Sequence, residues 1–516
     1  MKLLTNRRKF ILLLASTLGG FFTLARAQIN GAGGQGRGGR GGGRGRGGDN
    51  YVLPPDLTEF ALLSLVLGRA SDRSVAVSVL AGEPMEGYIE YGTASGHYGR
   101  KSDLRAFPTG KPVEWTFDGL QPDTEYYYRM QSRKPGETEF HARPECRFRT
   151  RRATGSTFTF GIQGDSHPER PQMSDPELYA RTLLDAASGK PDFYICMGDD
   201  FSVDTLRTVS AETVAARYTL QRPFLGLVAR SAPLFLLNGN HEQASLFNFN
   251  QTDIRHDVAV WAQNARNLYF PTPAPGGGYS GDIEPLKTIG SLRDYYAWNW
   301  GDALFVVLDN YWHSPDLVDN GFQERDEGGG QGQNGKRDRD WWGLTLGDTQ
   351  YDWFKRTLEE SKARHKFVFA HHVLGSGRGG IDECDLYEWG GRNKRGDWEF
   401  DLRRPGWELP VHQLMVKHGV TIFFQGHDHL FARQERAGIV YQEVPMPADQ
   451  GYVAYNADRY GSGVTLPNSG HLRVTVSPDQ VKVDYIRCYL PKDETDGRKT
   501  GEIVHSYTVK PKGGDA

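Results

Sequence analysis

The stretch TIFFQGHDH, residues 421–429, passes directly from an apolar run into two histidines. A short apolar run that ends at a glycine is typical of a buried strand followed by a turn. In an extended segment residues two apart point to the same side, so we expect His427 and His429 to face the same site. Asp428 is then expected to face away, either behind these ligands or toward solvent. Spacing alone leaves two interpretations open for the histidines, candidate metal ligands or an ordinary polar turn, and the rest of the chain decides between them.

Four further apolar runs end in a similar polar cluster: TFTFGIQGDSH (157–167), FYICMGDD (193–200), PLFLLNGNHE (233–242) and KFVFAHH (366–372). Considered alone, each cluster could be explained as an ordinary turn or as a pair of polar surface residues. Ligands of open α/β sheets gather beyond the carboxyl ends of the strands, so the clusters are expected to meet in one crevice. Together they supply two carboxylates, one amide oxygen and four imidazoles: Asp165, His167, Asp199, Asn240, His371, His427 and His429. This set suits two transition-metal ions that share one carboxylate, with Fe, Mn, Zn or Co all acceptable.

The chain changes character near residue 156. Residues 53–152 show period-2 alternation, as in Val75, Val77 and Val79, with turn residues between the runs, which predicts a β-sandwich. From about residue 156, strand patterns alternate with helical ones, which predicts an α/β domain. SGHLRVTV (469–476) and QVKVDYIR (480–487) are expected to form a terminal hairpin, residues 491–516 a tail, and the Gly-rich residues 320–338 a surface loop.

The five clusters together resemble the motifs of the calcineurin-like metallophosphoesterase superfamily, over roughly residues 156–490. The motifs read GDSH (164–167), GDD (198–200), GNHE (239–242), AHH (370–372) and GHDH (426–429). The resemblance implies a four-layer αββα sandwich. LQPDTEYYYRM (120–130) is similar to the signature of fibronectin type III domains, and to the domain that precedes the catalytic domain of purple acid phosphatases. A support or docking role is expected for this part of the chain.

The resemblance also assigns roles to the candidate residues. One metal would be held by Asp165, His167 and His429, the other by Asn240, His371 and His427, with Asp199 bridging them. Hydroxide generated from metal-bound water would attack phosphorus in line, and His241 would protonate the leaving group or hold a phosphate oxygen. A purely structural role for His241 is the alternative. In the His371–His372 pair, the first histidine is the expected ligand.

Position 202 departs from two branches of this superfamily. Purple acid phosphatases have a tyrosine ligand there, and phosphoprotein phosphatases have an aspartate that orients the histidine of GNHE. Ser202 can serve neither purpose, so a tyrosinate-coloured site is not expected and the partner of His241 stays open. Two arginines are candidates for substrate binding: Arg378, in the long segment 375–407, and Arg255. Either of them could also be an ordinary solvated arginine.

The N-terminal 52 residues are set aside from the fold. Residues 1–27 resemble a twin-arginine export signal, with Arg7 and Arg8 before an apolar stretch that is too short, at about 15 residues, to cross a membrane. Residues 28–52 are rich in glycine and arginine and are interpreted as a flexible linker rather than a nucleic-acid tract. We therefore expect a periplasmic or secreted protein without a membrane span.

Charge and cysteines set further limits. The formal net charge of −3 becomes −8 without the five basic residues of the signal, and near −11 without the linker as well. An acidic body argues against general nucleic-acid binding, for which a basic surface is typical. Four cysteines lack CxxC spacing, and their pairing stays open.

The leading hypothesis is an exported binuclear-metal hydrolase of phosphoric esters, acting on phosphorylated small molecules or nucleotides as a mono- or diesterase. One alternative is hydrolysis of a nucleotide or another phosphoanhydride. An alternative of another class is a non-catalytic, metal-stiffened surface-binding protein. The complete ligand set and the additional His241 favour the enzyme. Metal identity and oligomeric state stay open.

Overall fold

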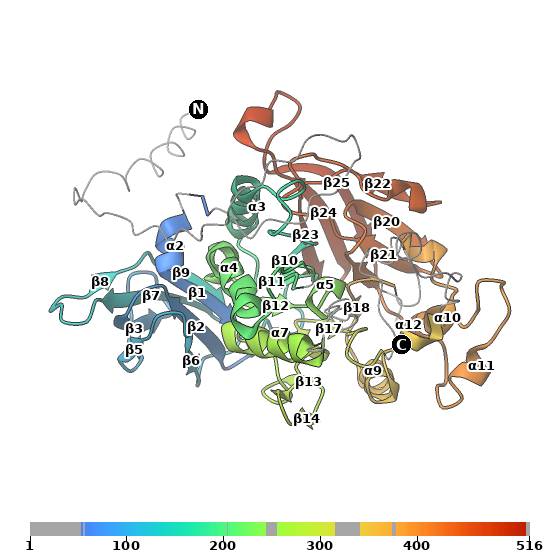
Figure 1. Ribbon diagram of the computed structural model, residues 1–516, viewed down its shortest axis with the longest axis horizontal. Coiled ribbons are helices and arrows are strands. Elements are labelled where there is room, and N and C mark those ends of the chain that lie inside the picture. Colours follow the sequence, from blue (N-terminus) through green and yellow to red (C-terminus); the bar gives the residue numbers. More distant parts are fainter. Residues whose placement is uncertain are drawn as a thin grey trace. The chain divides into compact units, whose positions relative to one another are not determined.

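The computed structural model describes residues 53–54, 57–203, 205–243, 255–314, 341–373 and 378–511. The expected signal and linker, and the expected loop at 320–338, lie outside these residues. The described chain begins with a short helix, α2 (Thr58–Leu62), and continues into two small antiparallel sheets (Figure 1).

The two small sheets form the predicted β-sandwich. One sheet has the order β1 (Leu63–Gly68), β2 (Val75–Ala81) and β6 (Val113–Phe117). In the other, β3 (Met85–Gly92) and β7 (Glu125–Arg133) are central, with β4 (Arg100–Lys101), β5 (Arg105–Phe107), β8 (His141–Ala142) and β9 (Cys146–Arg149) beside them. Val77 and Ile89, from opposite sheets, both belong to the buried core. The period-2 pattern therefore marks the inner faces correctly.

A six-stranded sheet combines three strands from the start of the α/β domain with three strands from the C-terminal part of the chain. Its order is β12 (Leu234–Leu236), β11 (Phe193–Cys196), β10 (Phe158–Gln163), β23 (Gly470–Ser477), β24 (Gln480–Arg487) and β25 (Glu502–Val509). β10, β11 and β12 are parallel, whereas β23 runs antiparallel to β10. The expected hairpin of β23 and β24 is present and extends this sheet.

The expected tail at 491–516 is partly wrong, because β25 pairs with β24 inside this sheet. Tyr507 and Val509 pack against the core, and they lie opposite Val483 and Val481. Most side chains of β25 are exposed, so its apolar signal is weak in the sequence.

A second, eight-stranded sheet lies against the first. Its order is β13 (Tyr279–Gly281), β16 (Tyr296–Trp300), β17 (Ala303–Val307), β18 (His365–Phe369), β19 (Ile422–Gln425), β21 (Ile439–Glu443), β20 (Phe431–Arg436) and β22 (Val464–Leu466). β17, β18, β19 and β21 are parallel. Phe160 of the first sheet contacts Phe305, Phe367 and Phe424 of the second, which places an aromatic core between the two sheets.

Helices cover the two outer faces, because alternate strand residues point outward. Tyr194 of β11 packs among α3 (Pro176–Ser188), α4 (Ala211–Ala229) and α7 (Arg255–Tyr269). On the other side, Val306 of β17 packs among α9 (Asp348–Glu360) and α12 (Val411–Lys417). The layers are thus helix, sheet, sheet, helix, as the resemblance implied (Figure 1). Shorter helices are α5 (Asn240–Gln243), α10 (Tyr387–Gly390) and α11 (Phe400–Arg403).

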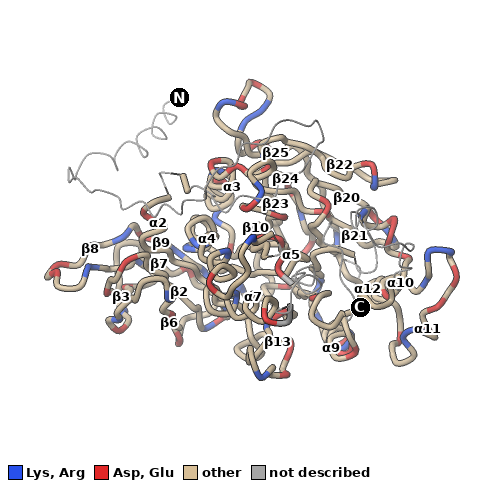
Figure 2. Tube along the Cα trace, viewed as in Figure 1, with Lys and Arg blue, Asp and Glu red and all other residues tan. Residues whose placement is uncertain are grey.

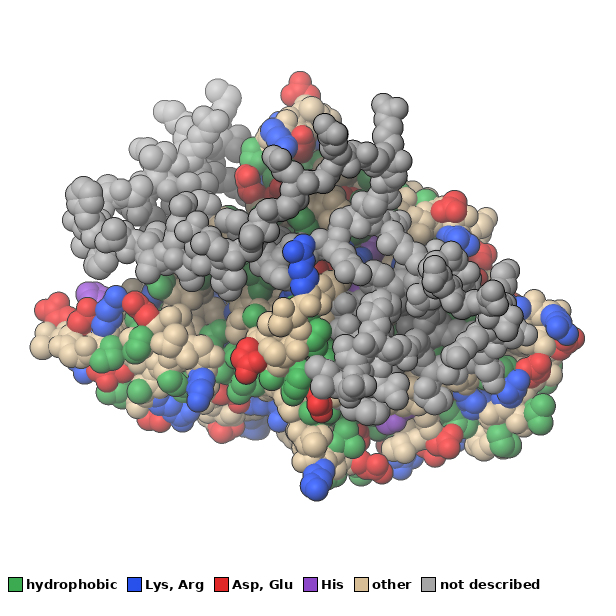
Figure 3. Space-filling model, in the orientation of Figure 1, with side chains coloured by type: hydrophobic (Ala, Val, Ile, Leu, Met, Phe, Trp, Pro, Cys, Tyr) green, Lys and Arg blue, Asp and Glu red, His purple; other side chains and the backbone are tan. Residues whose placement is uncertain are grey.

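Three further observations concern the surface charges, the cysteines and the hydropathy of the helices. Basic and acidic residues are interspersed along the described chain (Figure 2), and both mix with apolar side chains on the face of Figure 3 where described residues are drawn. All four cysteines are free thiols, and Cys196 is buried. Within the described residues, no helix combines the length and hydropathy needed to span a bilayer.

Candidate metal centre

The candidate ligands follow the carboxyl ends of five strands, two from the second sheet and three from the first. These strands are β10, β11, β12, β18 and β19. Parallel strands place their carboxyl ends at one edge of a sheet, so the loops that follow them meet there. The structure brings the ligand atoms into three overlapping groups, in each of which all atoms lie within 4.8 Å of one another: Asp165–His167–His429, His167–Asp199–His241 and Asp199–His371–His427.

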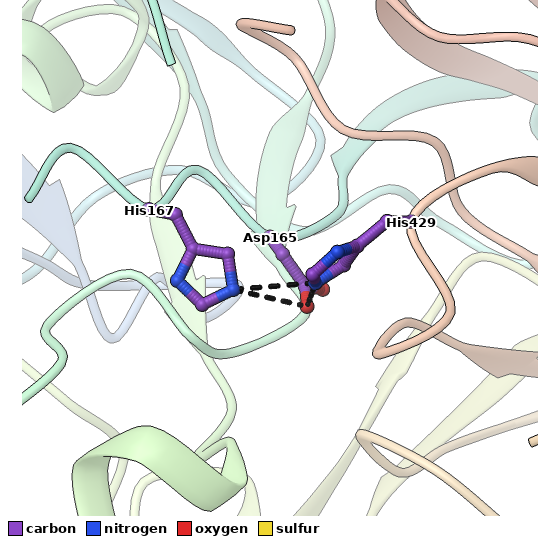
Figure 4. Close-up of side chains that lie close together, drawn as sticks. All are labelled: Asp165, His167 and His429. Carbon is purple, nitrogen blue, oxygen red and sulfur yellow. Dashed lines mark hydrogen bonds and ion pairs between the residues drawn. The ribbon is translucent and has the colours of Figure 1, made fainter. Parts of the chain in front are cut away.

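The first group joins the loops after β10 and β19 (Figure 4). Nε2 of His429 lies 2.9 Å from Oδ2 of Asp165, and 3.2 Å from Nε2 of His167. These two ring nitrogens face each other from separate loops, as expected of two imidazoles aimed at one cation. All three side chains are buried. The group expected to hold the first metal is therefore assembled around one point.

The second group forms around the amide of Asn240. Its Oδ1 lies 3.0 Å from Nε2 of His371 and 2.9 Å from Nδ1 of His427. Nδ1 of His371 lies 2.8 Å from the carbonyl of Met197 and donates to it. That hydrogen bond fixes the tautomer of His371 and leaves Nε2 as its ligand atom. The three residues expected to hold the second metal thus also converge.

Asp199 lies between the two groups, where a shared ligand is expected. Among the described residues its buried Oδ2 has no hydrogen-bond partner, although Nε2 of His371 lies 3.2 Å away and Nε2 of His167 lies 3.7 Å away. Burial raises the pKa of Asp199, but the imidazoles of His371 and His241 outweigh burial and hold that pKa well below its ordinary value. A buried, ionised oxygen without a hydrogen bond fits a position between metal ions.

The same carboxylates act on His371. Burial lowers the pKa of His371, but Asp199 and Asp165 outweigh burial and raise that pKa to about 10. The pair of carboxylates therefore draws positive charge into the site. Two metal ions would meet this demand directly, so the donor set fits the ions that the resemblance implies.

Glycines of the motifs let the chain approach these carboxylates. A Cβ on Gly239 would lie 2.1 Å from Oδ1 of Asp199, and a Cβ on Gly426 would lie 2.7 Å from Oδ1 of Asp165. Any side chain at either position would displace a candidate ligand. The glycines of GNHE and GHDH are thus required because the neighbouring carboxylates leave no room for a Cβ atom.

Two buried glutamates support the ligand loops. Oε1 of Glu169 lies 3.1 Å from Nδ1 of His167 and orients that ring. Glu242 accepts backbone N–H groups from both the GDD and GNHE loops: those of Asp199, Asp200, Phe201 and Gly239. Ser202 lies 3.3 Å from Nδ1 of His167 and so serves the first group. Sequence reasoning did not give Glu169 a role, although it stands two residues after a predicted ligand.

His241 lies beside both groups, with its backbone N–H donating to Oδ1 of Asp199 over 2.8 Å. Its ring packs edge-on against the ring of His167, with centroids 5.2 Å apart. The sequence did not identify a partner for His241. In the structure Arg170 is such a partner, because its Nη2 lies 2.8 Å from Nε2 of His241. The motif GDSHPER contains this arginine, but a single arginine after a histidine carries no specific signal.

The extended backbone expected for His427 and His429 is wrong. The backbone is not extended there: φ is 76° at His427 and 60° at His429, both left-handed. The two rings still enter different groups, one for each expected metal, and Asp428 stays outside both. Asp428 is buried rather than solvent-facing, and it accepts hydrogen bonds from Gly379 over 2.9 Å and Tyr460 over 2.7 Å.

The remaining candidates have different positions. Arg378 donates to the carbonyl of His427 and, over 3.1 Å, to Asp428, so it braces the GHDH loop. Arg255 is the first residue of α7, and its side chain lies outside the described residues. His372 is buried and its ring packs on that of His427, 4.8 Å between centroids.

A further group, Asp185–His471–Cys488, also lies within 4.8 Å. The 3.0 Å hydrogen bond between Asp185 and His471 accounts for it, beside a buried thiol.

Comparisons with known proteins agree with this architecture. The family model for calcineurin-like phosphoesterases matches residues 158–431. The solved structure of PhoD has a TM-score of 0.60 at 15% identity, covering 88% of this chain and 90% of that one. It shows a shared fold.

Other matches are weaker. GAP50, the anchor in the inner membrane complex of Plasmodium, has 12% identity, covers 70% of this chain and 90% of its own, and reaches a TM-score of 0.38. Phosphopantetheinyl hydrolase from Mycobacterium tuberculosis has 16% identity, 57% and 92% coverage, and a TM-score of 0.29. We draw no structural conclusion from similarities this weak. No curated protein sequence matches the chain.

Proposed function

The chain belongs to the calcineurin-like phosphoesterase family, and we propose that it hydrolyses phosphoric esters with two metal ions bound where the carboxyl ends of its strands meet. Metal-dependent phosphoester hydrolysis is the chemistry of the family. The finer proposal, a binuclear centre, is supported chiefly by Asp199, whose buried Oδ2 lies between two groups of candidate ligands. Asp165, His167 and His429 would hold one ion, and Asn240, His371 and His427 the other.

The residues of the chain have separate tasks in this proposal. When bound, the two ions supply Lewis acidity toward phosphoryl oxygens and lower the pKa of water in the site. Asp199 fixes the position of the two ligand groups relative to each other, because Glu242 holds the loop that carries Asp199. His241 holds a phosphoryl oxygen or gives a proton to the leaving oxygen of the ester. Substrates are phosphorylated small molecules or nucleotides, as monoesters or diesters.

The test is turnover of aryl phosphate mono- and diesters by metal-loaded protein and by its Asp199→Asn variant. We expect the variant to lose at least about 100-fold in kcat and to retain less metal, because even partners of ligands are worth 10–100-fold. Asp484→Asn is the matched control: Asp484 is a buried carboxylate of β24, paired with Arg473. Its turnover and metal content should equal those of the wild type.

The outcomes separate the alternatives. Turnover of nucleoside triphosphates, with neither ester hydrolysed, would favour phosphoanhydride hydrolysis instead. If no phosphate substrate is turned over with any of several metals, the result would favour the alternative of a non-catalytic surface-binding protein. Equal turnover by wild type and Asp199→Asn would refute the proposed site.

Export by the twin-arginine route is the second part of the proposal. The support is the arrangement of Arg7, Arg8 and the short apolar stretch after them. Replacing both arginines with lysine should keep the precursor in the cytoplasm, as measured by fractionation of the expressing cells. Release of the lysine variant at the wild-type level would contradict this route.

A further inference from the structure

Arg170 stands at the edge of the ligand groups and is built into the turn after β10. Its backbone N–H donates to the carbonyl of His167 over 2.9 Å, which closes a turn directly after a candidate ligand. Its side chain is 17% exposed, so the guanidinium is largely buried yet still reaches solvent. Nη2 lies 2.8 Å from Nε2 and 3.3 Å from Nδ1 of His241. The guanidinium and the imidazole therefore lie in direct contact beside the ligand groups.

A carboxylate holds this guanidinium in position. Nε of Arg170 lies 3.2 Å from Oε1 of Glu169, and the same oxygen lies 3.1 Å from Nδ1 of His167. One buried glutamate thus fixes both a candidate ligand and the arginine. The orientation of the planar fork is set relative to the ligand group, as required for a group that must bind an anion at a defined point.

The donors of Arg170 are only partly used inside the protein. Glu169 takes Nε and His241 contacts Nη2, while Nη1 makes no hydrogen bond to the part of the chain that the structure describes. Arg378, the arginine expected to bind phosphate, is instead engaged by Asp428 and the carbonyl of His427. Of these two arginines, Arg170 is the one with donor capacity left beside His241.

We propose that Arg170, which contacts His241, binds a non-bridging oxygen of the substrate's phosphoryl group and thereby favours phosphomonoesters over phosphodiesters. This inference rests on the proposed function. A monoester carries two negative charges near neutral pH and a diester carries one, so a fixed guanidinium stabilises the monoester more. Charge on the equatorial oxygens persists into the transition state of phosphoryl transfer. Arginine is suited to this task because it stays charged and offers several donors in one plane.

Steady-state kinetics on a matched pair of aryl esters, one monoester and one diester, test the inference. We expect Arg170→Met to lower kcat/KM for the monoester about 10- to 100-fold, as for loss of a charge-assisted hydrogen bond, and to lower it far less for the diester. Inhibition by inorganic phosphate should weaken in parallel. Arg170→Lys should recover part of both losses, because it restores the charge without the fork.

Two controls separate substrate binding from a structural role. Metal content of Arg170→Met should equal that of the wild type, since loss of metal would mean that the arginine acts only through Glu169 and His167. Arg129→Met is the matched arginine control, because Arg129 pairs with Glu90 in the β-sandwich over 2.8 Å. It should leave both esters and phosphate inhibition unchanged.

The inference and the proposed function fail in different ways. Equal loss for both esters with unchanged phosphate inhibition would overturn the role of Arg170 and leave the hydrolase standing. If the wild type hydrolyses no ester, calorimetric titration of metal-loaded protein with inorganic phosphate still decides whether Arg170 binds a phosphoryl group. Equal phosphate affinity of wild type and Arg170→Met in that titration would overturn the inference.

Discussion

The position of His241 leaves its chemical role open to a direct test. Its backbone N–H is bonded to Asp199, and its Nε2 contacts Arg170. A residue so placed either donates a proton to the leaving oxygen or holds a non-bridging oxygen of the phosphoryl group. The two roles respond differently to the leaving group, because a good leaving group departs without a proton.

His241→Gln should therefore steepen the dependence of kcat on leaving-group pKa. Glutamine keeps a hydrogen-bond donor but supplies no proton at neutral pH. We expect a loss of about 100-fold for poor leaving groups and a small loss for activated aryl esters, measured over a series of substituted aryl phosphates. A loss that is uniform across the series would assign His241 to oxygen binding instead. Unchanged metal content is the control.

The residue types at the candidate centre were predictable, but their geometry was not. Spacing after five apolar runs indicated the residues that now lie within 4.8 Å in overlapping groups. The direction of each ring depends on backbone torsions, and φ of 76° at His427 departs from the extended segment that was expected. Arg170 could not be found in this way, because its contact with His241 depends on how two loops meet in the fold.

At the scale of elements, strands were predicted well where both faces are buried. β10, β11, β18 and β19 consist of such residues, and each was visible as a short apolar run. β25 is an edge strand with mostly exposed side chains, and its pairing with β24 comes from backbone hydrogen bonds that no residue pattern reports. The same reasoning explains why Tyr507 was assigned to a tail, although its hydroxyl donates to Gln442 over 2.8 Å.

At the scale of the whole described chain, the β-sandwich is joined to the catalytic domain by buried polar contacts. Arg222 of α4 is fully buried and extends into the sandwich. It donates to the carbonyls of Ser64 and Ser78, over 3.2 and 2.9 Å, and to the carbonyl of Tyr269 over 2.7 Å. Because these acceptors have little access to water, removal of the guanidinium would leave them unsatisfied.

Arg222→Met should consequently weaken the junction between the two domains without reaching the metal centre. An unsatisfied buried acceptor costs about 1–3 kcal/mol, so loss of contacts to three carbonyls should lower stability by about 3 kcal/mol or more. In scanning calorimetry we expect the wild type to unfold in one transition and the variant to unfold earlier, with the sandwich separating as its own transition.

Turnover well below the first transition should be preserved, because the contacts of Arg222 lie on Ser64, Ser78 and Tyr269 rather than on a candidate ligand. Arg129→Met, which removes a half-exposed pair within the sandwich, should shift the midpoint much less. A single transition at the wild-type midpoint for Arg222→Met would mean that apolar packing alone holds the two domains together.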